Sequence, residues 1–87
     1  MGRDTALVAS SMIRYDEHAE FQISRRGIDK AWVEDTLHNP DLVETKGRRR
    51  SHFKCLPGRH IMLRVVTAES YPEHVITAYF DRKRPCV

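Results

Sequence analysis

The hydrophobic pattern of this 87-residue chain changes at Pro40. Before Pro40, apolar residues recur at the three- and four-residue spacing of amphipathic helices; after it, they alternate with polar residues, as in half-buried strands. Helices therefore come first and strands follow. This order predicts an α+β fold, in which the helices pack on one face of a sheet around a single core.

The pattern predicts two helices with clear end signals, over residues 16–26 and 29–38. Asp16 and Asp29 are expected to be N-cap residues, because their carboxylates can accept hydrogen bonds from the first free N–H groups. Gly27 supplies a left-handed residue that ends the first helix. Pro40 ends the second, because the residue before a proline leaves helical space.

The second part of the chain predicts four strands, over residues 41–45, 49–56, 60–68 and 74–80. We expect a mainly antiparallel sheet of three to four strands, with 69–73 as a hairpin loop. Residues 1–14 are expected to be a loose N-terminal arm, and residues 15–87 a single domain.

Alternation along the last two strands predicts which side chains face the helices. The apolar set of the strands is expected to pack on apolar helix residues: Val65, Ile76, Ala78 and Phe80 against Ile23, Trp32, Val33 and Leu37. Trp32 is interpreted as a core anchor rather than a base-stacking platform. Arg64, Thr77 and Tyr79 are left on the opposite, open face.

Positive charge gathers in the second half of the chain. Residues 1–44 hold five basic and nine acidic side chains, a charge of −4, whereas residues 45–87 hold ten basic and three acidic ones, a charge of +7. No acidic residue lies between Lys46 and Arg64, which include seven basic residues. This asymmetry indicates a polyanion or an acidic protein as partner.

The sequence favours no metal site, cofactor or membrane segment. Cys55 and Cys86 are expected to be free thiols of a cytoplasmic protein. His52, Cys55 and His60 come nearest to a metal-ligand cluster, but His52 and Cys55 should point to opposite faces of a strand. No apolar run approaches the roughly 18 residues of a membrane span, and no signal peptide is visible.

Five short motifs carry a resemblance to a known family. They are His18-Ala19, Arg26-Gly27-Ile28-Asp29, Leu37-His38-Asn39-Pro40, Leu63-Arg64-Val65-Val66 and Val75-Ile76-Thr77-Ala78-Tyr79. In this order and spacing they resemble DUF4258, a small bacterial family of unknown function. The family usually has arginine where this chain has Gln22, and Thr or Ser where it has Asp16.

Families of this shape are similar to the RelE-like and BrnT-like toxins of toxin–antitoxin pairs. In those toxins a helical pair packs on an antiparallel sheet whose open face binds and cuts RNA. The resemblance implies a metal-independent endoribonuclease with four catalytic residues: His18, Arg26, Arg64 and Tyr79. The expected nucleic-acid-binding residues are Arg48, Arg49, Arg50, His52, Lys54, Thr77, Arg82 and Lys83.

The residue types fit such chemistry. His18 would act as general base or acid, because histidine titrates near neutral pH. Arg26 and Arg64 would stabilise charge developing on the phosphate, and Tyr79 would donate a proton or stack on a base.

Two further interpretations stay open. The chain is alternatively a non-catalytic module that contacts RNA or an acidic protein through its basic sheet. It could also be a partner-dependent domain, such as one half of a toxin–antitoxin pair that has lost its activity. The expected partners are thus RNA or the ribosome, or an acidic or antitoxin protein; the sequence leaves the oligomeric state open.

Overall fold

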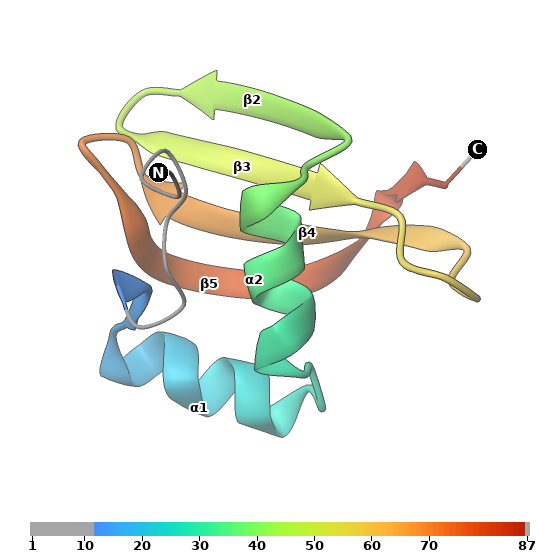
Figure 1. Cartoon of the computed structure of the whole chain (residues 1–87), viewed down its shortest axis with the longest axis horizontal. Coiled ribbons are helices and arrows are strands. Elements are labelled where there is room, and N and C mark those ends of the chain that lie inside the picture. Colours follow the sequence, from blue (N-terminus) through green and yellow to red (C-terminus); the bar gives the residue numbers. More distant parts are fainter. Residues whose placement is uncertain (1–11, 87) are drawn as a thin grey trace, which may run out of the picture.

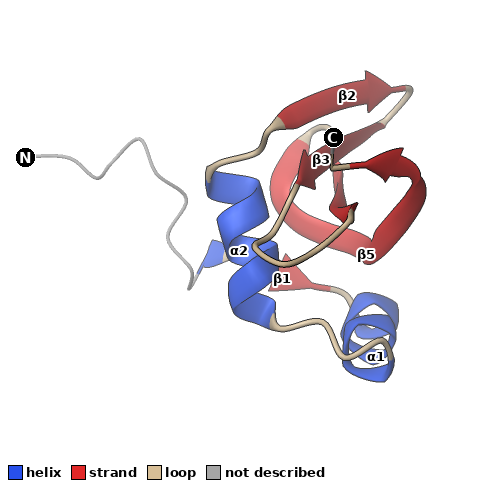
Figure 2. Ribbon diagram, turned by 90° about the vertical axis from the view of Figure 1, so that its right-hand side faces the viewer, coloured by secondary structure: helices blue, strands red, loops and turns tan. Residues whose placement is uncertain are grey.

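A strongly curved five-stranded sheet carries two helices on its outer face (Figures 1 and 2). The computed structural model describes residues 12–86. The strands are β1 (Arg14–Tyr15), β2 (Leu42–Lys46), β3 (Arg49–Lys54), β4 (Ile61–Ala68) and β5 (Tyr71–Pro85), in the order β1-β5-β4-β3-β2. Neighbouring strands are antiparallel except β1, which runs parallel to β5. The α+β class is confirmed, but the described sheet is mixed and has five strands rather than three to four.

Both helices form where the sequence predicts them. They are α1 (Glu17–Arg25) and α2 (Lys30–His38). Asp16 accepts a hydrogen bond from the Ala19 N–H (2.8 Å), and Asp29 accepts one from the Ala31 N–H (2.9 Å). Gly27 has a φ of 66° and turns the chain directly from α1 towards α2.

Strand β1 is the element that the sequence did not predict. It pairs only two residues, Arg14 with His74 and Tyr15 with Val75, which is too short for any periodic signal. Ile13, just before it, is 7% exposed and belongs to the core. The last residues of the expected loose arm, Ile13 and Arg14, therefore belong to the folded domain. Residues 1–11 of that arm lie outside the described residues.

The core forms between the helices and the outer face of the sheet, largely as predicted. Val65 and Ala78 are buried with Ile23 and Val33, while Trp32, Leu37 and Phe80 pack against them. The prediction for Ile76 is wrong, because a β-bulge flips the alternation: Val66 pairs with Thr77, but the next residue, Thr67, pairs with Val75. Ile76 is the extra residue, and Val75 enters the core instead. The expected hairpin loop is also shorter, because β5 already begins at Tyr71.

The two cysteines form a disulfide, which corrects the expectation of free thiols. Strand β5 extends to Pro85, which lies opposite Ile61 at the start of β4. This pairing brings Cys86 beside the β3–β4 loop that contains Cys55, with the two Cα atoms 5.4 Å apart. That separation is well suited to a disulfide. Within the described residues, neither helix has the length and apolar character that a membrane crossing requires.

Candidate functional site

An open pocket of about 320 Å³ lies on the inner face of the curved sheet, away from the helices. It is lined by Lys46, Arg49, Ser51, Arg64, Val66, Thr77 and Tyr79. Strand register explains the arrangement: Ser51, Val66 and Thr77 face one another across three strands, and Arg64 pairs with Tyr79 in the next row. The alternation in the sequence predicted Arg64, Thr77 and Tyr79 on this face, and the pocket brings them together.

Lys46 and Arg49 supply free positive charge at one end of the pocket. They flank the two-residue turn between β2 and β3 and are directly paired, so both side chains lie on the same face. Neither side chain makes a hydrogen bond or ion pair with another described residue. Two uncompensated cations at the mouth of a pocket favour an anionic ligand.

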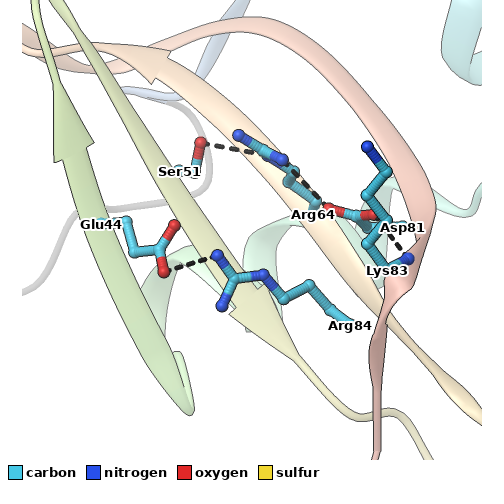
Figure 3. A network of polar contacts seen from close by, with 6 residues as sticks. All are labelled: Glu44, Ser51, Arg64, Asp81, Lys83 and Arg84. Atoms are coloured by element: carbon cyan, nitrogen blue, oxygen red, sulfur yellow. Dashed lines mark hydrogen bonds and ion pairs between the residues drawn. The ribbon is translucent and has the colours of Figure 1, made fainter.

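Arg64 is held in place by a partly buried polar network (Figure 3). Its Nε donates to Ser51 Oγ (3.1 Å) and its Nη1 donates to Asp81 Oδ2 (3.0 Å). Asp81 also accepts the Lys83 backbone N–H (2.9 Å). Burial raises the pKa of Asp81, but the Lys83 N–H, the hydrogen bond and charge of Arg64 and the charge of Arg84 outweigh it, and the pKa is lowered. The guanidinium is therefore oriented by two of its five N–H groups, and the others remain available to a ligand.

Tyr79 has two guanidinium groups near its ring. The Cζ atom of Arg26 is 5.7 Å from its ring centroid, and that of Arg64 is 5.8 Å away. Arg26 comes from the end of α1 and donates to the Ala78 carbonyl (2.8 Å) and to Thr77 Oγ1 (3.4 Å). Strand β1 pairs with β5 only at His74 and Val75, and Arg26 bonds to β5 just after these residues. The charge of Arg26 therefore lies beside the pocket.

His18 is not brought to this group. It is exposed near the start of α1, where its Nε2 accepts a hydrogen bond from the Gln22 side chain (3.2 Å). Eight residues separate it from Arg26, or about 12 Å along a helix axis. Within residues 12–86, His18 makes no hydrogen bond or ring contact with Arg26, Thr77 or Tyr79.

Strand alternation divides the predicted basic residues of β3 between the two faces. Arg49 lines the pocket, whereas Arg50, His52 and Lys54 lie on the side of the sheet that faces the helices. Arg50 approaches Glu69 (3.7 Å), and Lys54 donates to a backbone carbonyl just after α2 (2.9 Å). His52 is buried, its Nδ1–H donates to a β4 carbonyl (3.2 Å), and burial lowers its pKa.

The remaining predicted binding residues lie at the margins. Arg48 is exposed in the turn next to Arg49, and Arg82 and Lys83 are exposed after Asp81. Sequence reasoning did not single out three lining residues: Lys46, Ser51 and Val66. Lys46 could have been found from the register of a two-residue hairpin, because Lys46 and Arg49 flank the turn Gly47-Arg48 and therefore pair with each other.

Across residues 12–86, no group of three or more His, Cys, Asp or Glu side chains is placed to hold a metal ion. The pocket itself is lined by three cationic side chains, two hydroxyls, a phenol and a valine. Such a lining can bind phosphate through charge and hydrogen bonds, and a flat ring through the face of Tyr79.

Comparison with known proteins identifies a family. The model of a protein family described as "Domain of unknown function (DUF4258)" matches residues 15–80, which include both helices and most of the sheet. No curated protein and no solved structure matches the chain significantly.

Proposed function

Because the chain belongs to the DUF4258 family, whose description leaves its function open, we propose from the pocket itself that the inner face of the sheet binds single-stranded RNA. The observation that carries the proposal is the position of Lys46 and Arg49. They are two cations without a described partner, and they share a pocket with the fixed guanidinium of Arg64 and the ring of Tyr79.

The charges of the inner face favour a phosphate over other ligands. The pocket lining includes no carboxylate. Two nearby carboxylates are already paired, Asp81 with Arg64 (3.0 Å) and Glu44 with Arg84 (2.6 Å). An anion entering the pocket therefore meets net positive charge, and a phosphate can receive forked hydrogen bonds from a guanidinium.

The shape of the site favours a single strand over a duplex. The sheet is strongly curved (Figure 2), and the pocket on its inner face has Tyr79 in its wall. A base can stack on that ring only if it is free of its neighbours, as in loops and single strands. The resemblance to RelE-like and BrnT-like toxins, whose open sheet face contacts RNA, supports RNA rather than DNA.

The test is the salt dependence of binding. We would measure the affinity of a fluorescent oligoribonucleotide between 50 and 300 mM salt, because each neutralised phosphate of a single strand contributes a slope of about 0.7. The double variant Lys46→Gln/Arg49→Gln should lower the slope by about 1.4. A control of equal charge, Arg14→Gln/Arg25→Gln, changes β1 and α1 and should leave the slope unchanged.

Two results would contradict the proposal. One is an affinity that ignores both salt and the Lys46/Arg49 change. The other is equally tight binding of polyglutamate, which has the charge but no base, and which would point to an acidic protein partner instead. A duplex and a single-stranded DNA of the same sequence serve as further competitors, and both should bind more weakly.

RNA cleavage is the second candidate, favoured by the position of Tyr79 near the guanidinium groups of both Arg26 and Arg64. A phenol beside two guanidiniums could donate a proton while the cations stabilise the charge on the phosphate. Tyr79→Phe should then lower the rate by about 10²–10⁴-fold, chelators should have no effect, and cyclic-phosphate ends should form. His18→Ala should leave the rate unchanged, because the His18 side chain bonds to Gln22 and contacts none of the described pocket residues. RNA that stays intact while bound would leave the non-catalytic module as the function.

A further inference from the structure

Phe53 is an aromatic side chain on the inner face that is fully buried. It pairs across the sheet with Arg64, which pairs with Tyr79, so the three side chains form one row on that face. Tyr79 lines the pocket, but Phe53 does not. Two guanidinium groups cover its ring instead: the Cζ atom of Arg84 is 4.7 Å from the ring centroid, and that of Arg64 is 5.1 Å away.

Arg84 belongs to a segment that crosses this end of the inner face (Figure 3). We call residues 82–86 the clasp. Its Arg84 reaches from β5 to β2, where Nη2 lies 2.6 Å from Glu44 Oε2. At its end, Cys86 forms the disulfide with Cys55 in the β3–β4 loop.

Apart from its peptide bond to Asp81, the clasp is joined covalently to the described sheet through the disulfide. The other attachments are the Arg84–Glu44 ion pair, whose side chains are 35% and 42% exposed, and the pairing of Pro85 with Ile61. Two hydrogen bonds add to them, from the Lys83 N–H to Asp81 (2.9 Å) and from the Cys86 N–H to the His60 carbonyl (2.9 Å). Exposed ion pairs contribute little to stability in water. Without the disulfide, non-covalent contacts alone hold the clasp across the inner face.

We propose that Phe53 is a second base-stacking surface, which the clasp covers while Cys55 and Cys86 are joined and which reduction uncovers. This inference rests on the proposed RNA binding and adds a second subsite and its regulation. The guanidinium of Arg84 is a flat cation stacked on the ring, so it occupies the position that a base would take. Once it leaves, Arg64 still lies near both rings, 5.1 Å from the Phe53 centroid and 5.8 Å from that of Tyr79, and the part of the Phe53 ring that Arg84 covered becomes open to a base. Pairs of aromatic residues on neighbouring strands bind successive bases of single-stranded RNA in other sheet proteins.

The reduction needs a dithiol as co-reactant. One thiolate of the dithiol attacks a sulfur of the Cys55–Cys86 bond and forms a mixed disulfide, and its second thiol then displaces the protein sulfur. Two electrons pass from the dithiol, which becomes a disulfide, and Cys55 and Cys86 both end as thiols. The reverse exchange with an oxidised dithiol closes the clasp again.

The experiment compares the protein with and without a dithiol reductant, beside Cys86→Ser, which cannot form the disulfide. Amide hydrogen exchange over residues 82–86 measures the clasp directly, without RNA. An oligouridylate of eight nucleotides serves as the RNA probe. After reduction we expect faster amide exchange over residues 82–86 and about tenfold tighter binding of the oligouridylate. Such a gain in affinity is of the size that stacking one base on an aromatic ring contributes. Cys86→Ser should behave as the reduced protein does and ignore the reductant.

The role of Phe53 is tested in the Cys86→Ser background. Phe53→Leu keeps most of the buried volume, and a thermal melt checks the fold. It should return the affinity to that of the oxidised protein. The proposal is overturned by unchanged exchange after reduction, by RNA affinity that is the same in both redox states, or by Phe53→Leu without effect. If RNA binds in neither state, the proposed function fails as well; if it binds equally in both and requires Lys46 and Arg49, only the clasp fails.

Discussion

Asp81→Asn should destabilise the fold and release Arg64 from its fixed position. The Asp81 side chain is 10% exposed and accepts hydrogen bonds from Arg64 (3.0 Å) and from the Lys83 N–H (2.9 Å). A hydrogen bond to a charged group contributes about 1.5–3 kcal/mol. Asparagine keeps one acceptor oxygen but loses the charge, and Arg64 retains its bond to Ser51. We therefore expect a loss of about 1.5–3 kcal/mol in the free energy of unfolding at pH 7.

The stability that Asp81 contributes should depend on pH. Folding lowers the pKa of Asp81, so the ionised carboxylate stabilises the native state. That contribution is fully present above the unfolded pKa of about 3.9 and is lost as the pH falls through the lower folded-state value. The difference between the wild type and Asp81→Asn should therefore shrink steadily between pH 4 and pH 2.

Urea denaturation followed by circular dichroism measures both quantities. Glu44→Gln is the matched control, because Glu44 also pairs with an arginine but its side chain is 42% exposed. It should cost less than about 1 kcal/mol. An Asp81→Asn variant within 0.5 kcal/mol of the wild type at pH 7, or a difference that persists at pH 2, would refute the reasoning.

Three further predictions concern single positions. Arg49→Gln should lower the salt slope of RNA binding by about 0.7, whereas Arg50→Gln, on the other face of β3, should not change it. Folding lowers the pKa of His52, so the unfolded state binds its proton more readily and stability should fall as the pH drops below about 6.5. His52→Gln should reduce that fall in urea titrations between pH 7.5 and pH 5, and an unchanged fall would contradict the assignment. Gly27→Ala should cost about 1–2 kcal/mol in the same assay, because its φ is 66° although the added Cβ meets nothing within 4 Å; a cost near zero would argue against the left-handed turn.

The sequence predicted the helices well because their end signals are local. The capping carboxylates of Asp16 and Asp29 and the left-handed Gly27 each act within a few residues, and the structure confirms all three. Strand β1 gave no such signal. Its two residues join the sheet through partners about 60 positions away, near His74.

The inner face could be predicted only as far as strict alternation holds. Alternation placed Arg64, Thr77 and Tyr79 together. At Ile76, however, a β-bulge shifts the alternation, so Val75 rather than Ile76 faces the core. The same rule, applied to three consecutive arginines, would have shown that they cannot share a face. The disulfide depends on the extension of β5 to Pro85, which no local pattern reveals.

The central claim is that RNA occupies the pocket between the β2–β3 turn and Tyr79. The most direct measurement is a titration of ¹⁵N-labelled protein with a short single-stranded oligoribonucleotide, followed by NMR. We expect the amide shifts to change at Lys46, Arg49, Arg64 and Thr77, while the outer surfaces of α1 and α2 stay unchanged. Shift changes confined to the helices, or no change at saturating RNA, would contradict the account.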